Sequence, residues 1–132
     1  ASLASYFASY AQQFLELASV SCGLDIAENL PRCPLNSKFR HSLFLAFKEA
    51  LNNIARHAGA SEARLQIKVE GDQLVLALTD NGRGLDASEP GPGADGLLNM
   101  RQRISALGGR CDVNSLGQTG TMVLFRVPVP QA

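Results

Sequence analysis

The strongest constraint on the fold is a pair of strand-like segments separated by only two residues. Segments 63–70 and 73–80 are rich in apolar and β-branched residues, and Gly71 and Asp72 between them favour a tight hairpin turn. A hairpin pairs its two strands antiparallel. Two further strand-like segments, 110–115 and 121–129, are joined by a glycine-containing turn. The sequence therefore predicts a largely antiparallel sheet.

Three other segments have the apolar spacing of amphipathic helices. In the first, the apolar residues recur at alternating steps of four and three, at Leu3, Phe7, Tyr10, Phe14 and Leu17. Gly23 should end this helix, and a short strand is expected at 24–29. The second helix should run from an N-cap at Ser37 to about residue 58, and the third from about residue 97 to 107.

These elements predict a two-layer α/β sandwich, because helices that share an apolar side can cover one face of the sheet. The sheet should be mixed but mainly antiparallel, with about five strands and with three helices on one face. No linker divides the 132 residues. We expect an N-terminal helix in residues 1–22 and a single compact domain in residues 23–132.

Composition excludes several classes of protein. Twelve basic residues balance twelve acidic ones, without the basic excess typical of a nucleic-acid binder. No apolar stretch is long enough to span a bilayer, and no signal peptide is evident. Cys22, Cys33 and Cys111 are odd in number and lack metal-site spacing, so reduced thiols are expected. Because the sequence begins at Ala1 without a methionine, we expect a longer parent protein.

The second helix carries the first chemical signal. At about 100° per residue, Glu49, Asn53 and Arg56 share one face. The opposite face carries Phe47, Leu51, Ile54 and Ala58. Asn is unfavourable in mid-helix, and a carboxylate one turn from an Asn is suited to a hydrated Mg²⁺. A solvated polar face explains this helix almost as well.

The end of segment 73–80 carries the second signal. Asp80 ends a strongly apolar strand, and Gly82 and Gly84 follow at once. This arrangement offers a hydrogen-bond acceptor, for example for the exocyclic amine of adenine, beside backbone that a flat ligand can approach closely. An Asn81-Gly82 hairpin turn would need a second strand directly afterwards, and residues 85–92 do not resemble one.

Glycines also precede the third helix and the last strand. Gly91, Gly93 and Gly96 approach a helix start, where free N–H groups can bind an anion and the loop could close as a lid. A plain surface loop explains them nearly as well. Residues 117–121, Gly-Gln-Thr-Gly-Thr, are fully explained as a hairpin turn.

The order of these motifs resembles the GHKL superfamily, which has the Bergerat ATP-binding fold and contains DNA gyrase, heat-shock chaperone ATPases, histidine kinases and the MutL mismatch-repair proteins. The resemblance covers residues 24–130. Residues 49–58, Glu-Ala-Leu-Asn-Asn-Ile-Ala-Arg-His-Ala, resemble the N box of histidine kinases. Residues 96–109, which begin Gly-Leu-Leu-Asn-Met-Arg-Gln-Arg, resemble the subclass that signals to response regulators with helix-turn-helix output domains.

The resemblance implies a role for each residue of the N box. Glu49 would polarise or deprotonate the attacking nucleophile. Arg56 and His57 would neutralise or orient phosphate oxygens. Asn53 would hold the Mg²⁺ that bridges the phosphates of ATP, with Glu49 contributing through a water molecule. These roles suit phosphoryl transfer, in which positioning and charge neutralisation dominate.

The adenine would be bound by the second and last motifs. Asp80 would accept a hydrogen bond from the adenine amine, with Gly82 and Gly84 allowing close approach. Thr121 would lie beside the adenine.

The third motif would bind the phosphates, through the backbone of Gly93 and Gly96. The family often has Gly-x-Gly-Leu at this position, whereas this chain has Gly-Ala-Asp-Gly-Leu at residues 93–97. The first glycine is offset by one residue, and Asp95 adds negative charge. This departure keeps a non-catalytic nucleotide-binding or docking module as an alternative to a kinase.

The resulting expectation is the cytoplasmic catalytic domain of a two-component sensor histidine kinase that uses ATP and Mg²⁺, from a parent protein that could be anchored in a membrane. Neither His41 nor His57 fits a phosphoacceptor, so the acceptor is expected on a dimerisation domain upstream, and the chain alone should not autophosphorylate. The first helix could end that dimerisation helix or could simply pack on its own sheet. A response regulator is the expected further partner, without nucleic acid or direct membrane contact. An anti-sigma-type serine kinase is the alternative within the same fold.

Overall fold

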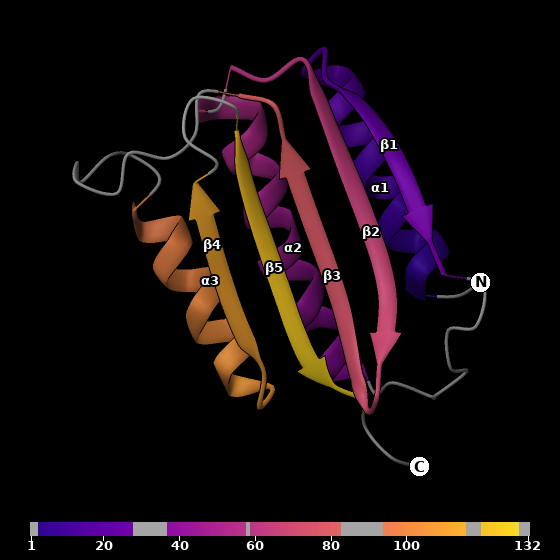
Figure 1. Ribbon diagram of the computed structural model, residues 1–132. Helices are drawn as coiled ribbons and strands as arrows, with labels where there is room; N and C mark the ends of the chain where they lie inside the picture. Colours follow the sequence, from indigo (N-terminus) through magenta and orange to yellow (C-terminus); the bar gives the residue numbers. More distant parts are fainter. Residues whose placement is uncertain (1–2, 28–36, 58, 83–93, 116–119, 130–132) are drawn as a thin grey trace.

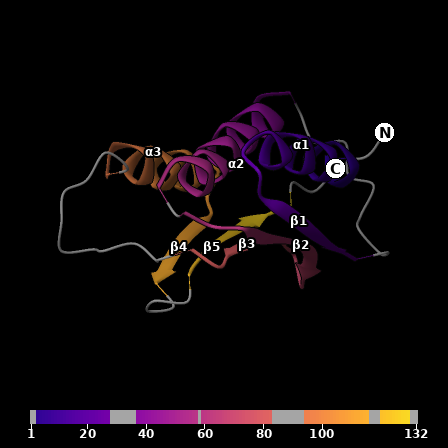
Figure 2. The same cartoon turned by 90° about the horizontal axis from the view of Figure 1, so that it is seen from above.

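The computed structural model describes residues 3–27, 37–57, 59–82, 94–115 and 120–129. Within these ranges the elements follow in the order α1 (Leu3–Leu17), β1 (Ser21–Ile26), α2 (Ser37–His57), β2 (Glu62–Glu70), β3 (Gln73–Asp80), α3 (Ala94–Ala106), β4 (Arg110–Ser115) and β5 (Thr121–Pro128). The helices form one layer and the sheet forms the other (Figures 1 and 2). The predicted two-layer sandwich is confirmed.

The sheet has five strands in the order β1-β2-β3-β5-β4. The predicted hairpin pairs β2 with β3, Glu70 opposite Gln73, and Gly71 takes the turn with φ 62°. β5 is antiparallel to both β3 and β4, whereas β1 runs parallel to β2 at the edge of the sheet. The sheet is therefore mixed and mainly antiparallel, as predicted.

The hydrophobic core fills the space between the two layers. The rings of Phe7 in α1 and Phe47 in α2 stack with centroids 4.8 Å apart, and both side chains are buried. Met100 and Ile104 of α3 are fully buried in the same cluster. β3 lies at the centre of the sheet, and its residues 74–78 are all buried. This central strand therefore holds its last residue, Asp80, in a fixed position.

The structure corrects the prediction at the end of the first helix. α1 ends at Leu17 rather than near Gly23, and Ser19 adopts φ 63° in the turn that stops it. The N–H of Val20 donates to the carbonyl of Leu15 at 2.8 Å, and both side chains are buried. This is the Schellman arrangement, which usually has glycine where Ser19 stands. Gly23 consequently lies inside a strand.

Two further elements differ from the predicted bounds by three residues, each for its own reason. β1 covers Ser21–Ile26 instead of 24–29, since the chain leaves α1 earlier, and residues 28–29 lie outside the described ranges. α3 begins at Ala94, three residues before the predicted start near Leu97. Gly96 lies within its first turn, and burial of Met100 and Ile104 outweighs the helix penalty of one glycine, about 1 kcal/mol.

α1 packs against β1 and α2, and its Ala8, Ala11 and Leu15 are buried in the common core. That α1 also ends a dimerisation helix stays a prediction. In the described part of the chain, no helix is both long enough and apolar enough to cross a membrane.

Candidate functional site

The C-terminal half of α2 separates polar from apolar side chains as predicted. Leu51 and Ile54 are buried against the sheet, whereas Glu49 and Asn53 are half-buried and Arg56 is exposed. The amide Nδ2 of Asn53 is buried without a hydrogen-bond partner among the described residues. Such unsatisfied groups are rare and costly in folded proteins. Asn53 is therefore a polar group available to a ligand or to the water around a metal ion.

Asp80 and Thr121 form a buried polar pair at one end of the sheet. They are directly opposite each other on β3 and β5. Only 6% of Asp80 and 5% of Thr121 is exposed, and these are the buried polar or charged residues within the described ranges. The family resemblance implies that both would lie at the adenine, although 41 positions separate them. The structure brings them together through the pairing of β5 with β3.

The loop after Asp80 orients its carboxylate. The N–H of Gly82 donates to Oδ1 of Asp80 at 2.8 Å, and Gly82 is itself buried. Burial raises the pKa of Asp80, while hydrogen bonds from the backbone of Gly82 and Thr121 act in the opposite direction. A carboxylate that is held in place by backbone donors keeps lone pairs for a further donor, such as an amine of a ligand.

The raised pKa of Asp80 predicts how stability depends on pH. The ionised carboxylate is disfavoured in the folded state, so the stability that its neutral form contributes is lost as pH rises through the folded pKa. Asp80→Asn removes this loss. We expect the unfolding temperature of Asp80→Asn relative to wild type to increase from about pH 3.5 to about pH 7.5. Thermal melts followed by circular dichroism measure the difference, with the exposed Asp25→Asn as control. A difference that shrinks with rising pH would contradict the assignment.

Gly120 lies beside the candidate site, and no role of its own was predicted for it from the sequence. It is buried, has φ 130°, and lies so close to β3 that a Cβ would overlap the carbonyl oxygen of Asp80 and lie 2.8 Å from its carbonyl carbon. The start of β5 thus crosses directly over the backbone of Asp80. The motif containing Gly120 had been explained as a hairpin turn, and local sequence gives no sign of this contact.

The described parts of the predicted site gather at one end of the molecule. The end of α2, the end of β3 and the start of β5 all lie at the top of Figure 1, where α3 also begins. The N–H of Asn81 donates to the carbonyl of Glu62 at 3.1 Å, which links β3 to the start of β2 shortly after α2. Gly84 and Gly93 lie outside the described residues, and of His57 only its place at the end of α2 is described.

A sequence profile of the family described as "Histidine kinase-, DNA gyrase B-, and HSP90-like ATPase" matches residues 40–131. The chain belongs to this ATPase family. The resemblance predicted from the motifs is confirmed, and the GHKL architecture of this ATPase domain accounts for the order of its helices and strands.

Relatives of this ATPase domain include sensor kinases from several bacteria. The sensor histidine kinase LiaS of Bacillus subtilis (strain 168) is 30% identical over 106 residues, which span 80% of this chain and 29% of LiaS. The signal transduction histidine-protein kinase/phosphatase UhpB of Salmonella typhimurium is 38% identical over 94 residues, 71% of this chain and 18% of UhpB. The chain therefore spans less than a third of the length of these relatives.

A solved structure has the same fold as this ATPase domain. The histidine kinase domain of the blue-light activated histidine kinase from Erythrobacter litoralis EL346 superposes with a TM-score of 0.76 at 21% identity. The match covers 96% of this chain and 61% of that chain. The helices and the mixed sheet of the described residues thus have the fold of that domain.

The protein alone does not supply a complete metal cage in the parts of the ATPase domain that the structure describes. These parts contain no group of three or more His, Cys, Asp or Glu residues that could hold an ion. Mg²⁺ normally takes one or two protein ligands and fills its remaining positions with water and phosphate oxygens. The unpartnered amide of Asn53, one turn from Glu49, fits such a site, because rotation of the amide presents its oxygen in place of its nitrogen.

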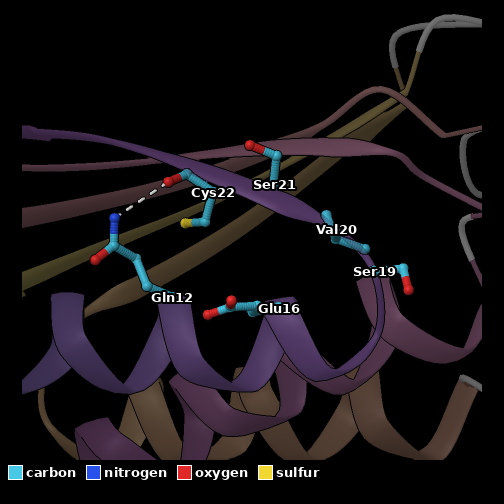
Figure 3. Close-up of a pocket in the computed structure, with 6 residues that line it drawn as sticks. All are labelled: Gln12, Glu16, Ser19, Val20, Ser21 and Cys22. Carbon is cyan, nitrogen blue, oxygen red and sulfur yellow. Dashed lines mark hydrogen bonds between the residues drawn. The ribbon is translucent and has the colours of Figure 1, made fainter.

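An open hollow of about 460 Å³ lies elsewhere on the ATPase domain, between α1 and the start of β1 (Figure 3). Gln12, Glu16 and Cys22 are among its lining residues, and Nε2 of Gln12 donates to the carbonyl of Cys22 at 3.3 Å. Burial raises the pKa of the Cys22 thiol, which keeps it protonated. None of the predicted site residues lines this hollow, so it is separate from the candidate nucleotide site.

Proposed function

We propose that this chain is the ATP-binding catalytic domain of a two-component sensor histidine kinase. The single observation that carries the proposal is the buried pair of Asp80 and Thr121 at the end of the sheet, on the side where α2 ends. A buried carboxylate that backbone N–H groups already orient can accept a further hydrogen bond, and the adenine amine can donate one. The names of the relatives, which include sensor histidine kinases, support a histidine as the acceptor of the phosphate.

Different residues of this chain bind the adenine and the phosphates of ATP. Asp80, Gly82, Gly84 and Thr121 bind adenine, which fixes the nucleotide at the sheet end. Gly93 and Gly96 offer backbone N–H groups to the phosphates. These contacts hold the γ-phosphate in line with an imidazole nitrogen from a separate dimerisation domain, and such positioning supplies much of the rate in phosphoryl transfer.

The helix α2 provides the chemistry at the transferred group. Glu49 accepts a proton from, or polarises, the attacking imidazole, while the bond between the γ-phosphorus and the bridging oxygen breaks and ADP leaves. Arg56 and His57 neutralise the phosphate oxygens. Asn53, with Glu49 through water, would hold Mg²⁺, and the ion would neutralise phosphate charge. The phosphate then passes to a response regulator, and the domain acts in the cytoplasm.

The proposal is tested by calorimetric titration of the chain with a non-hydrolysable ATP analogue, with and without Mg²⁺. We expect wild type to bind more tightly with Mg²⁺. In Asn53→Ala the Mg²⁺-dependent gain should disappear, because the amide that holds the ion is gone. Asn99→Ala, a change of an exposed Asn on α3, is the control. No binding by folded wild type would contradict the nucleotide site, and an unchanged Mg²⁺ gain in Asn53→Ala would contradict its metal role.

Transfer itself is tested in trans. Wild-type chain, ATP and Mg²⁺ are incubated with the purified dimerisation domain of a relative such as LiaS, and the acid-labile phosphate formed on that domain is measured. Glu49→Gln should bind the ATP analogue without Mg²⁺ with wild-type affinity. With Mg²⁺ and ATP it should transfer phosphate about 100-fold more slowly, the usual contribution of a positioned base. Equal transfer rates would contradict the role of Glu49.

A further inference from the structure

The two halves of the nucleotide site belong to segments that are far apart in the chain. One half is on α2, with Asn53, and the other is at the end of β3, with Asp80. A nucleotide bound between them needs a fixed distance between these elements. Within the described residues, the residue after Asp80 is hydrogen-bonded to the segment that follows α2 and begins β2.

Asn81 makes four hydrogen bonds to two consecutive residues, Ser61 in the loop after α2 and Glu62 at the start of β2. Its Oδ1 accepts hydrogen bonds from the N–H of Ser61 at 3.0 Å and of Glu62 at 2.9 Å. Its Nδ2 donates to Oγ of Ser61 at 3.0 Å. The backbone N–H of Asn81 donates to the carbonyl of Glu62 at 3.1 Å. Ser61 follows the last residue of α2, His57, by four positions.

The geometry of an extended chain explains why the side chains of Asp80 and Asn81 have different surroundings. Successive side chains point to opposite sides of an extended chain, so the carboxylate of Asp80 is buried while the amide of Asn81 is exposed. Ser61 is also anchored on its other side, since its carbonyl accepts from the N–H of Ser21 at 3.0 Å. The loop after α2 is thereby tied to both β1 and β3.

We propose that Asn81 is a positioning residue. It holds Ser61 and Glu62, which follow α2, against the end of β3. It thereby sets the distance between the magnesium half of the site on α2 and the adenine half at Asp80. The inference rests on the proposed nucleotide-binding function. Asn81 touches neither adenine nor phosphate in this proposal. It acts through Ser61 and Glu62 on one side and through Asp80 on the other.

The proposal predicts different effects on ligands of different length. ATP with Mg²⁺ contacts both halves, whereas adenosine contacts only the adenine half. Asn81→Ala should lower the affinity for a non-hydrolysable ATP analogue with Mg²⁺ by about tenfold, because displacements near 1 Å are costly in such sites. Adenosine affinity should stay within about twofold of wild type. Calorimetry measures the first and NMR titration the second.

Conservative variants identify the hydrogen bonds as the cause. In Asn81→Asp the carboxylate can still accept from Ser61 and Glu62, and the Ser61 hydroxyl can reverse to donate, so most of the affinity for the ATP analogue should return. Ser61→Ala removes one hydrogen bond out of four and should cost about twofold. Gln66→Ala is the matched control, because Gln66 also donates an exposed hydrogen bond between neighbouring segments, to Asp25 at 3.2 Å, away from the site.

Two outcomes would overturn the inference while wild type still binds nucleotide. One is an Asn81→Ala variant that binds the ATP analogue as wild type does. The other is an equal loss for adenosine and for the ATP analogue, with no recovery in Asn81→Asp, which would mean that the change only loosens the Asp80 loop. Absence of nucleotide binding in wild type would instead remove the proposed function, and the positioning role with it.

The hydrogen bonds themselves are tested without nucleotide. The amide protons of Ser61 and Glu62 should exchange with solvent faster in Asn81→Ala than in wild type, and about as slowly in Asn81→Asp as in wild type. Gln66→Ala should leave both unchanged. Exchange at these two amides that does not respond to Asn81→Ala would overturn the connection. If Asn81→Ala fails to fold, Ser61→Ala replaces it in the ligand comparison, with an expected loss of about twofold for the ATP analogue and none for adenosine.

Discussion

Gly120→Ala should destabilise the domain by about 3 kcal/mol and lower its unfolding temperature by roughly 10 °C. Two costs combine at this position. With φ 130°, Gly120 has a backbone conformation that residues with a Cβ rarely adopt. The added methyl would also overlap the carbonyl oxygen of Asp80 and lie 3.2 Å from Cα of Asn81. β5 would have to move away from β3 where Asp80 pairs with Thr121, so nucleotide binding should fall too.

The matched control for Gly120 is Gly71→Ala. Gly71 also has positive φ, 62°, but a Cβ there meets nothing within 4 Å. This variant therefore carries the backbone strain, about 1 to 2 kcal/mol, without the overlap. Thermal unfolding of both variants separates the two costs. If Gly120→Ala melts at the same temperature as Gly71→Ala, the close approach of β5 to Asp80 does not matter for stability.

The sequence predicts local elements of this domain well and non-local pairing poorly. β3 was predicted with its observed bounds, Gln73–Asp80, because an apolar run is followed by a polar end and preceded by a two-residue turn. The insertion of β5 between β3 and β4 has no local signal, since it depends on β3–β5 pairs that are 41 to 55 positions apart. Asp80 and Thr121 are adjacent because β5 is inserted beside β3. The motif order suggested it only through the family resemblance.

The first boundary error has a specific physical cause. A glycine is the usual residue at the end of a helix, so Gly23 was assigned that role, but Ser19 takes the left-handed conformation instead. What stabilises it is the contact of Val20 with Leu15, both buried under the sheet. Tertiary packing of this kind outweighs the preference for glycine and is invisible in the local sequence.

In the candidate site too, local features were predictable from the sequence and contacts between distant segments were not. The polar stripe of α2 was predicted from helical spacing, and the burial of Leu51 and Ile54 behind it is confirmed. Asn81 was considered only as half of an Asn-Gly turn. Its amide instead bonds to Ser61 and Glu62, some 20 positions earlier in the chain. A polar side chain directly after a buried strand residue was the available signal, but its partners depend on the fold.

Asp80→Ala should abolish recognition of adenine and lower the affinity for an ATP analogue by about 100-fold. The reason is the environment of the carboxylate. It is 6% exposed, it is oriented by the N–H of Gly82, and burial raises its pKa. A site built to hydrogen-bond one polar group discriminates strongly against ligands without that group. Wild type should accordingly prefer the ATP analogue to the matching purine nucleotide that lacks the exocyclic amine.

The loss of this preference is the sharper measurement, because it isolates the bond between Asp80 and the amine. In a double-mutant cycle, wild type and Asp80→Ala are each titrated with the two nucleotides, and Asp80→Ala should bind both equally weakly. Asp25→Ala removes an exposed carboxylate at the far edge of the sheet and should retain the preference of wild type. If Asp80→Ala still prefers the nucleotide with the amine, another group reads the adenine and Asp80 is buried for structural reasons alone. If neither wild type nor Asp80→Ala distinguishes the two nucleotides, the buried carboxylate does not contact the base.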